Sequence, residues 1–527
     1  MIKTSVSVGL GYTLDDVKRA VSAHLPITVD ELKNITLLHS SLSLDDKTSP
    51  AYKLTVGITL SPDREAGLLK MRKKVSRVPD LTFPPIKSAI PSRPVVVGAG
   101  PCGLFAALLL AESGARPIVI ERGEAVEERG KSVRKFITEK ALSTESNVQF
   151  GEGGAGTYSD GKLKVGSLDK YKMKVLTEFC RAGASDEIMH SATAHLGTDK
   201  LSLIVKNLRE RIKSLGGEFI YSAKLVDYKA VGGTLSSVTY IKDGEEIILP
   251  TGNAILAIGH SARDTYEMLL SKGAPMVAKG FGIGMRIEHP REYINELIYG
   301  KGYDTRLETA SYHLVTHLKN GRSVYSFCMC PGGTVVAATS ETSGIVTNGM
   351  SEFDRDGRNS NAALLVSVTP DDFADGTPLA GIALQRQIER AAYSLTDSYR
   401  APTVKAIDLV GVKGRVLDTD VTPTYPVGTH THHPDEYMPK YIAESLTNGL
   451  VDFDEWMPGY YVENAVLTGP ETRTTAPVRI LRGENYALLG MDGVYPAGEG
   501  AGYSGGIVSS AVDGLRCAEA MLLKYSL

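Results

Sequence analysis

Hydrophobic and polar positions alternate along the first eighty residues in the manner of a small domain with strands and amphipathic helices. The run "KTSVSVGL" has the period of two that a half-buried strand requires. The apolar positions that follow share one face of a helix: Leu14, Val17, Val21 and Leu25. Thr13 is the expected N-cap of this helix, and Asp16 completes a capping box. Strand-like runs "NITLLHSSLSL" and "AYKLTVGITL" and a helix around 66–75 complete an α+β module, for which a ferredoxin-like arrangement is a candidate.

The pattern of apolar and polar positions that predicts strands and helices ends after this module. The basic run "KMRKKVSR" ends it, and a solvated helix end is favoured there over a nucleic-acid patch. The stretch "FPPIKSAIPSRP" has four prolines in twelve residues, so it can continue neither a helix nor a central strand. We therefore expect a stiff linker over residues 83–94. Beyond it, strand-like and helix-like segments alternate with many glycines, which is typical of α/β folds.

A dinucleotide fingerprint follows the linker in "PVVVGAGPCGLFAALLLAESGARPIVIERG". A short buried strand over 95–97 leads into Gly98, Gly100 and Gly103, which form G-x-G-x-x-G before an apolar helix. Gly98 permits the tight turn, Gly100 admits a pyrophosphate close to the backbone, and Gly103 lets helix and strand pack closely. The second strand, "PIVIE", ends in Glu121, which suits a ribose without a phosphate. This pattern favours FAD or NAD over NADP.

A second glycine-rich turn lies near the C-terminus, in "PAGEGAGYSGGIVSSAVDGLRCAEAM". It resembles the return of the chain to the FAD domain in the glutathione reductase superfamily, with Gly498 and Glu499 as the pair near the ribityl chain. The resemblance implies that the following helix directs the N–H groups of Gly505, Gly506 and Ile507 at the flavin. A NAD domain needs no such distant turn, so FAD is the expected cofactor.

Two further segments resemble parts of the same FAD domain. "TGNAILAIGHSARDTYEML" is similar to the strand that closes that domain, with Ala257, Ile258 and Gly259 in place of A-T-G and Asp264 after it. "GGEFIYSAKLVDYKA" resembles the strand that contacts adenine, here near Leu225 and Val226.

The whole chain is similar to flavoproteins with a p-hydroxybenzoate hydroxylase-like arrangement. More narrowly, it resembles a bacterial family of FAD-dependent dehydrogenases and oxidoreductases. The segments "FGEGGAGTYSDGKL", "FCMCPGGTVVAATSE", "GRNSNAALLVSV" and "GPETRTTAPVRI" carry this resemblance. The first of them implies a polar loop that runs from the pyrophosphate towards the flavin, where Lys162 could contact the flavin or a substrate anion. The resemblance implies no particular substrate.

The expected cofactor site gathers residues from all of these segments. Its members are Gly98, Ala99, Gly100, Pro101, Cys102, Gly103, Glu121, Arg122, Arg129, Gly156, Thr157, Asp160, Gly161, Lys162, Leu225, Val226, Ala257, Ile258, Gly259, Asp264, Gly498, Glu499, Gly505, Gly506 and Ile507.

Candidates for chemistry lie mainly in "GPETRTTAPVRILR", just before the C-terminal return. Glu471 is eligible as the base that accompanies hydride transfer, and Arg473 could bind a carboxylate bidentately or serve an internal ion pair. Lys162 is the third candidate.

Two further groups of residues are weighed and set aside. We expect the strand to direct the sulfurs of the C-x-C pair Cys328/Cys330 to opposite faces, so structural cysteines are favoured over a redox dithiol. The histidines of "THTHHPDEY" sit in a proline-rich loop, and we predict no metal site.

The composition of the chain bears on its partners and on the cellular compartment in which it is found. The 527 residues carry a formal charge of −3, with 58 basic and 61 acidic side chains, which gives no reason to expect nucleic acid or a membrane as partner. A start without an apolar h-region and only five cysteines favour the cytoplasm. We expect a small-molecule substrate, and the oligomeric state is left open.

The predicted fold class is α/β. A Rossmann-like FAD-binding domain (95–264 and 476–527) is split by an inserted α+β substrate domain (265–475) and preceded by the N-terminal module (1–82) and the linker. The predicted function is an FAD-dependent oxidoreductase that transfers hydride between flavin N5 and an organic substrate. NAD(P)H would bind transiently, or the substrate itself would reduce the flavin, because only one fingerprint is visible. The alternatives are a flavin monooxygenase, or an RNA- or protein-binding flavoprotein in which FAD has a supporting role.

Overall fold

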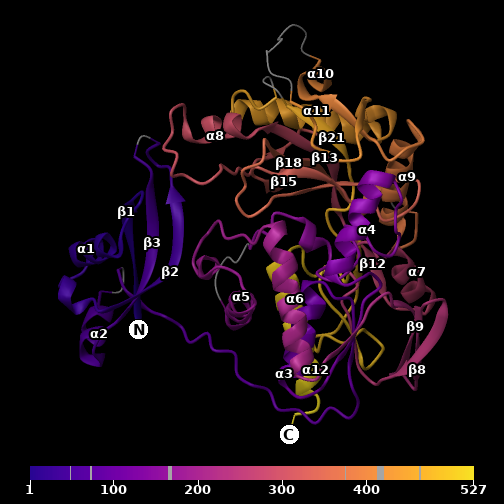
Figure 1. Cartoon of the computed structure of the whole chain (residues 1–527), viewed down its shortest axis with the longest axis horizontal. Coiled ribbons are helices and arrows are strands. Elements are labelled where there is room, and N and C mark those ends of the chain that lie inside the picture. Colours follow the sequence, from indigo (N-terminus) through magenta and orange to yellow (C-terminus); the bar gives the residue numbers. More distant parts are fainter. Residues whose placement is uncertain are drawn as a thin grey trace.

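The computed structural model describes residues 1–47, 49–71, 74–163, 169–373, 375–411, 421–461 and 465–526. Figure 1 shows three bodies: a small N-terminal module (indigo), a central domain built from both the early and the final parts of the chain, and a third domain (orange) above it. The predicted α/β fold class, with a split Rossmann-like domain, is confirmed.

The N-terminal module has the strand and helix order of a ferredoxin-like fold. Its elements are β1 (Ile2–Gly9), α1 (Leu14–His24), β2 (Asn34–Ser43), β3 (Ala51–Thr59), α2 (Pro62–Leu69) and β4 (Ser76–Arg77). They form one sheet in the order β2-β3-β1-β4, in which β1 is antiparallel to β3 and β4. The capping box of Thr13 and Asp16 is present. Leu14 departs from the predicted apolar face, because at the first helical position its side chain is 58% exposed.

Two differences from the sequence-based expectations occur at the end of this module. The second helix begins at Pro62, earlier than predicted, because Ser61 is its N-cap and a proline suits the first turn. Part of the basic run lies outside the described residues.

The predicted linker is packed against the central domain along its length. Phe83, Ile86 and Ile90 lie against the apolar core of that domain. Ser88 donates a hydrogen bond to the carbonyl of Leu522 (3.0 Å), close to the C-terminus. The segment therefore ties the module to the last helix of the chain, as its path in Figure 1 indicates.

A five-stranded parallel sheet forms the centre of the second domain, in the order β23-β11-β5-β6-β7. Its strands are β5 (Val95–Val97), β6 (Ile118–Ile120), β7 (Glu218–Ile220), β11 (Ala254–Leu256) and β23 (Val494–Pro496). This is the strand order of half a dinucleotide-binding fold, completed by a strand from the end of the chain.

Both faces of this sheet are covered. One face buries its side chains against α3 (Pro101–Glu112), α5 (Lys170–Arg181), α6 (Thr198–Ser214) and α12 (Ile507–Leu523). The other face packs on α7 (Arg263–Ser271) and on an antiparallel meander of β8 (Lys224–Val231), β9 (Thr234–Lys242) and β10 (Glu245–Pro250). Strands buried on both faces explain why the short runs of the sequence are continuously apolar.

The third domain is built on a seven-stranded sheet in the order β14-β15-β18-β13-β21-β19-β20. Its strands are β13 (Phe281–Pro290), β14 (Val315–His317), β15 (Ser323–Cys330), β18 (Asn359–Val368), β19 (Ala401–Lys405), β20 (Thr429–Thr431) and β21 (Val466–Glu471). Accompanying elements are α8 (Arg291–Tyr299), α9 (Ala380–Ser394), α10 (Ala406–Val410), α11 (Lys440–Trp456) and the hairpin of β16 (Thr334–Ala337) and β17 (Thr347–Met350).

The chain crosses between the two domains slightly later than residue 265. Helix α7 still packs on the central sheet, and β12 (Met276–Ala278) pairs with β22 (Val478–Ile480) at the junction. The seven-stranded sheet then begins at β13. Among the described residues, no helix is long and apolar enough to cross a membrane.

Candidate functional site

A cavity of about 520 Å³ lies at the carboxyl ends of β5, β6 and β11, where the N-termini of α3 and α12 meet the third domain. Ligands of open parallel sheets bind at this edge, because the loops that follow the strands gather there. Of the predicted site residues, those that line it are Gly98, Gly100, Pro101, Cys102, Glu121, Arg122, Gly156, Asp160, Gly161, Lys162, Leu225, Ala257, Ile258, Gly259, Glu471, Arg473, Glu499, Gly505, Gly506 and Ile507.

The glycines of the fingerprint serve two different purposes. Gly98 has φ +101°, and a Cβ at Gly103 would lie 1.8 Å from the carbonyl oxygen of Gly98, so both are needed by the fold itself. Gly100 is different: its backbone is extended, and a Cβ there would have the Cα of Gly154 as its nearest neighbour, at 3.6 Å. The protein alone therefore does not require glycine at residue 100, whereas a ligand held against the backbone does.

Two helices direct their N-termini at the cavity. Gly100 is the N-cap of α3 and Gly506 is the N-cap of α12, and neither has a side-chain capping bond within the part of the chain that is described. The two helices pack closely, since a Cβ at Gly514 would lie 2.1 Å from the carbonyl oxygen of Cys102. Uncapped N–H groups and two positive helix ends make this wall of the cavity a site for anionic oxygen atoms.

Glu121 organises the turns around the cavity. Its carboxylate accepts hydrogen bonds from the N–H groups of Ala99 (2.7 Å), Gly123 (2.9 Å) and Gly151 (3.0 Å). A carboxylate has about four acceptor positions, so one remains for a ligand hydroxyl. The prediction that Glu121 binds a ribose is compatible with this geometry, but its first task is to hold three loops together.

Two further charged residues of the predicted site, Arg122 and Glu499, also line the cavity. Arg122 forms a bidentate pair with Asp264 (2.9 and 2.8 Å), which places the aspartate behind the cavity wall. Glu499 lies partly buried in the wall, and the loss of hydration raises its pKa to about 7 against the attraction of Lys279.

Several predicted cofactor residues lie outside the lining: Ala99, Gly103, Arg129, Thr157, Val226, Asp264 and Gly498. Arg129 is fully buried, and its guanidinium donates to the carbonyls of Asn147, Val148, Glu152 and Gly154 at 2.8–2.9 Å. It therefore shapes the loop 147–154 from behind. Val226 follows Leu225 on a strand and so faces the opposite side.

The wall towards the third domain carries Lys162. Its ammonium donates to the carbonyl of Met329 and lies 4.0 Å from Asp160, which itself forms a bidentate pair with Arg355 (2.9 and 2.6 Å). Burial lowers the pKa of Lys162. Lys162 is thus bonded to β15, the strand that contains Cys328 and Cys330, and Arg355 fixes the loop around Asp160.

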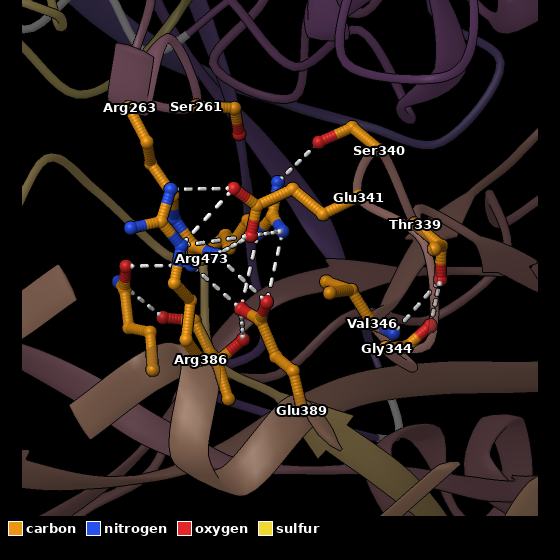
Figure 2. Close-up of polar contacts among 12 residues, drawn as sticks. Ser261, Arg263, Thr339, Ser340, Glu341, Gly344, Val346, Arg386, Glu389 and Arg473 are labelled. Atoms are coloured by element: carbon orange, nitrogen blue, oxygen red, sulfur yellow. Dashed lines mark hydrogen bonds and ion pairs between the residues drawn. The ribbon is translucent and has the colours of Figure 1, made fainter. Parts of the chain in front are cut away.

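Arg473 lies at the cavity wall within a buried ion-pair network (Figure 2). Its guanidinium donates to Glu389 at 3.0 and 2.8 Å, and Arg263 donates to the same carboxylate at 2.9 and 2.8 Å. Arg386 holds Glu341 at the edge of the network. Of the two roles weighed for Arg473, the structure displays the internal ion pair, since both of its edges are engaged by Glu389 and Ser340.

Glu471 is the other predicted catalytic residue, and its environment is different. It ends β21 opposite Gly284, and its side chain is 3% exposed. Its Oε2 lies 3.4 Å from Nε of Arg286 without hydrogen-bond geometry, and no other described residue bonds it. Burial raises the pKa of Glu471 to about 7, although the Arg286 charge acts in the opposite direction. This carboxyl group can gain or lose a proton near neutral pH.

The divergence predicted for the sulfurs of Cys328 and Cys330 does not follow from strand geometry. Residues two apart on a regular strand share a face, and β15 is irregular here, with φ +42° at Cys328 and a register shift between Phe327 and Cys330. The Cys330 thiol lies 3.2 Å from the Cys328 carbonyl oxygen, and Cys328 lines the cavity. His260, also in the wall, was missed by sequence reasoning, although it directly follows the predicted Ala257-Ile258-Gly259 turn. Burial and two nearby arginines lower the His260 pKa to about 3.

A second cavity of about 770 Å³ adjoins the first between the seven-stranded sheet and the start of α12. The two share Phe327, Thr474, Gly505 and Ser509 in their walls. The second cavity adds two basic residues, Lys279 and Arg479, and two tyrosines.

These walls fit an FAD molecule on grounds of the structure alone. The glycine cradle at residue 100 and the uncapped start of α3 suit a pyrophosphate, and the free acceptor of Glu121 suits a ribose. The start of α12 offers N–H groups where a flat ring with a polar edge would lie, and a Cβ at Gly505 would meet no described atom within 4 Å.

Comparison with known proteins agrees with this assessment. A family model for an FAD binding domain matches residues 93–135, and a model described as FAD-dependent protein, C-terminal domain-like, matches residues 280–474. An uncharacterized protein of Clostridium beijerinckii is 48% identical over 445 residues, which cover 83% of this chain and 82% of that protein.

Among solved structures, a triple mutant of the flavin-dependent brominase Bmp2 is 11% identical, with a TM-score of 0.36, over 82% of this chain and 80% of its own. A flavoprotein/dehydrogenase from Cytophaga hutchinsonii is 12% identical, with a TM-score of 0.37, over 82% and 78%.

Proposed function

We propose, from the premise that this chain belongs to a bacterial family of FAD-dependent proteins, that it is an oxidoreductase which transfers hydride between its flavin and a small organic molecule. FAD is its cofactor. When bound, FAD supplies a ring nitrogen, N5, that can accept or donate hydride. The other tasks of the reaction fall to residues of the chain.

The residues that would hold FAD are those of the glycine turn and the two helix starts. Gly100 and the first N–H groups of α3 would bind the pyrophosphate, Glu121 a ribose, and Leu225 the adenine end. Gly505, Gly506 and Ile507 would bind the polar edge of the flavin, where the positive end of α12 favours negative charge.

The substrate is assigned to the second cavity. This cavity shares walls with the flavin end of the first one, so a molecule in it would lie next to the flavin ring. Lys279 and Arg479 bring positive charge to it, and Tyr325 and Tyr503 bring aromatic surface. A small organic substrate with an anionic group suits this lining best, and neither nucleic acid nor a membrane is required.

Glu471 is assigned the proton transfer. A general base works best when its pKa lies near the working pH, and burial brings the pKa of Glu471 to about 7. The carboxyl group lies in the wall of the flavin cavity, and its Oε2 has no hydrogen-bond partner among the residues described. A titratable carboxyl group in the wall of the flavin cavity, whose Oε2 lacks a hydrogen-bond partner among the described residues, is the observation that carries the proposal.

The first experiment is an anaerobic visible spectrum of the purified protein, before and after NADH or NADPH is added. Bleaching by nicotinamide would support a reductase, and stable yellow colour would direct the search to a substrate that reduces the flavin itself. Oxygen consumption that requires both NAD(P)H and substrate would instead indicate a monooxygenase. A protein that binds no flavin would refute the proposal.

A further inference from the structure

We propose that Cys328 and Cys330 form a redox-active dithiol, which passes an electron pair to FAD and closes to a disulfide within the chain. This role goes beyond the hydride transfer proposed above and depends only on the FAD site. It assigns a second redox centre to the wall of the flavin cavity.

The first support is the position of the pair. Cys328 lines the cavity in the wall that also contains Phe327 and Glu471, next to the start of α12. The pairing of β15 with β18 shifts register between Phe327 and Cys330, so the chain bulges at the first cysteine. At this bulge the thiol of Cys330 lies 3.2 Å from the carbonyl oxygen of Cys328.

The second support is a buried positive charge behind the pair. Arg286 is fully buried, and its Nη2 lies 2.9 Å from the Cys328 carbonyl oxygen and 3.4 Å from the Cys330 sulfur. Its Nη1 has no hydrogen-bond partner in the described part of the chain. Among the described residues Arg286 forms a salt bridge with Glu471 alone, and the raised pKa of Glu471 leaves much of that carboxyl group protonated below neutral pH. A guanidinium with unused donor capacity stabilises a thiolate beside it.

The two thiols differ in acidity, as the attacking thiol and the resolving thiol of a redox pair do. The neighbouring Cys330 thiol and the charges of Arg286 and Lys162 lower the pKa of Cys328. Burial and the neighbouring sulfur raise the pKa of Cys330. Cys328 at the cavity is therefore the thiolate that reacts first, and buried Cys330 is its resolving partner.

The other three cysteines lack this combination. Burial raises the pKa of Cys102 and of Cys517, and it raises that of Cys180 to about 11. Cys102 also lines the cavity and has Cys517 and Arg482 near it, but burial and the charge of Asp513 raise its pKa. Only the pair on β15 joins a low-pKa thiol, a resolving thiol and a cationic neighbour among the described residues.

The reaction balances with the cofactor alone. Two S–H bonds break and one S–S bond forms, which releases two electrons and two protons, and full reduction of FAD takes up the same number. In the reverse direction, reduced FAD restores the dithiol. No further oxidant or reductant is needed for this internal step.

An anaerobic dithionite titration of the oxidised holoprotein tests the proposal by counting electrons. Wild-type protein should take up about four electrons per FAD, since flavin and disulfide each accept two. Cys330→Ser should take up about two. Cys180→Ser, which alters a cysteine remote from the cavity, should still take up about four.

Thiol counting gives a readout that does not depend on activity. The chain has five cysteines, so oxidised wild-type protein should show about three reactive thiols after unfolding and all five after reduction. A count of five in the oxidised protein would overturn the proposal, as would a two-electron titration of the wild type. A disulfide elsewhere would also overturn it, and peptide mapping would reveal that case.

The electron count and the thiol count do not depend on whether the proposed hydride transfer takes place. Bleaching by NAD(P)H or substrate can succeed or fail in Cys330→Ser regardless of the electron count. If Cys330→Ser does not fold, Cys328→Ser and the wild-type thiol count decide the question.

Discussion

Gly100→Ala should separate the needs of the cofactor from the needs of the fold. The backbone of Gly100 is extended, with φ −75° and ψ −178°, which an alanine adopts without strain. A Cβ there would contact only the backbone of Gly154, with its Cα at 3.6 Å and its nitrogen at 4.0 Å, which are ordinary packing distances. We expect the apoprotein's free energy of unfolding to change by less than ~1 kcal/mol, because the loss at an N-cap and the gain from a stiffer unfolded chain oppose each other.

FAD binding should respond far more strongly. A methyl group in the cradle would block the approach of a pyrophosphate to the start of α3, and a hydrogen bond to a charged group contributes ~1.5–3 kcal/mol. Loss of one or two such bonds weakens FAD binding by at least about tenfold to a hundredfold. Titration of the apoprotein with FAD, followed by quenching of flavin fluorescence, measures the dissociation constant directly. Thermal melting of the apoprotein measures stability in the same samples.

Gly103→Ala is the matched control. Its Cβ would lie 1.8 Å from the carbonyl oxygen of Gly98, so this variant should lose stability before any cofactor is added. Near wild-type FAD affinity in Gly100→Ala would refute the assignment of this turn to the pyrophosphate. An unstable Gly100→Ala apoprotein would show that glycine is needed there by the fold.

Three further changes test other parts of the structure. In the wild type, the rate at which substrate reduces the flavin should rise through pH 7, because only the ionised carboxylate of Glu471, which forms as pH rises above a pKa of about 7, can accept the proton. Glu471→Gln should abolish this rise. Stopped-flow traces across pH 5.5–8.5 show whether a rise persists. Arg129→Met should lower the FAD content of purified protein by loosening the loop 147–154, and unchanged FAD content would contradict its positioning role. Glu389→Leu leaves two buried arginines without their shared carboxylate, so urea unfolding should show a loss of ~3–5 kcal/mol. Lys53→Ala, in the exposed pair with Asp45, should leave the urea midpoint nearly unchanged.

Parts of the fold could be predicted from the sequence because their signals are local. The glycine turn, its strand and helix and the acidic residue after them lie within thirty residues of sequence. The capping box of Thr13 and Asp16 spans four residues. The return of the chain to the central domain is not local, and it was predicted only through its resemblance to other flavoproteins.

Side-chain roles that depend on distant partners could not be predicted in the same way. The partners of Arg129 are carbonyls of the loop 147–154, and nothing in the spacing shows that its charge turns away from the cavity. The Cys328 environment depends on Arg286, which lies two strands away in the sheet, since β15 and β13 both flank β18. Its bulge arises from pairing with β18, which the sequence of β15 alone does not reveal.

The position of β23 has a consequence for how the protein is made. Strand β6 ends at Ile120 and β23 begins at Val494, so at about 5–20 residues per second the ribosome needs roughly 20–75 s to synthesise the interval. Until then α3, which has ten buried residues in the finished protein, has no α12 to pack against. The nascent chain must therefore shield an apolar helix while the third domain emerges. FAD cannot make its full set of contacts during this interval, because α12, whose start would bind the flavin edge, is synthesised after the third domain.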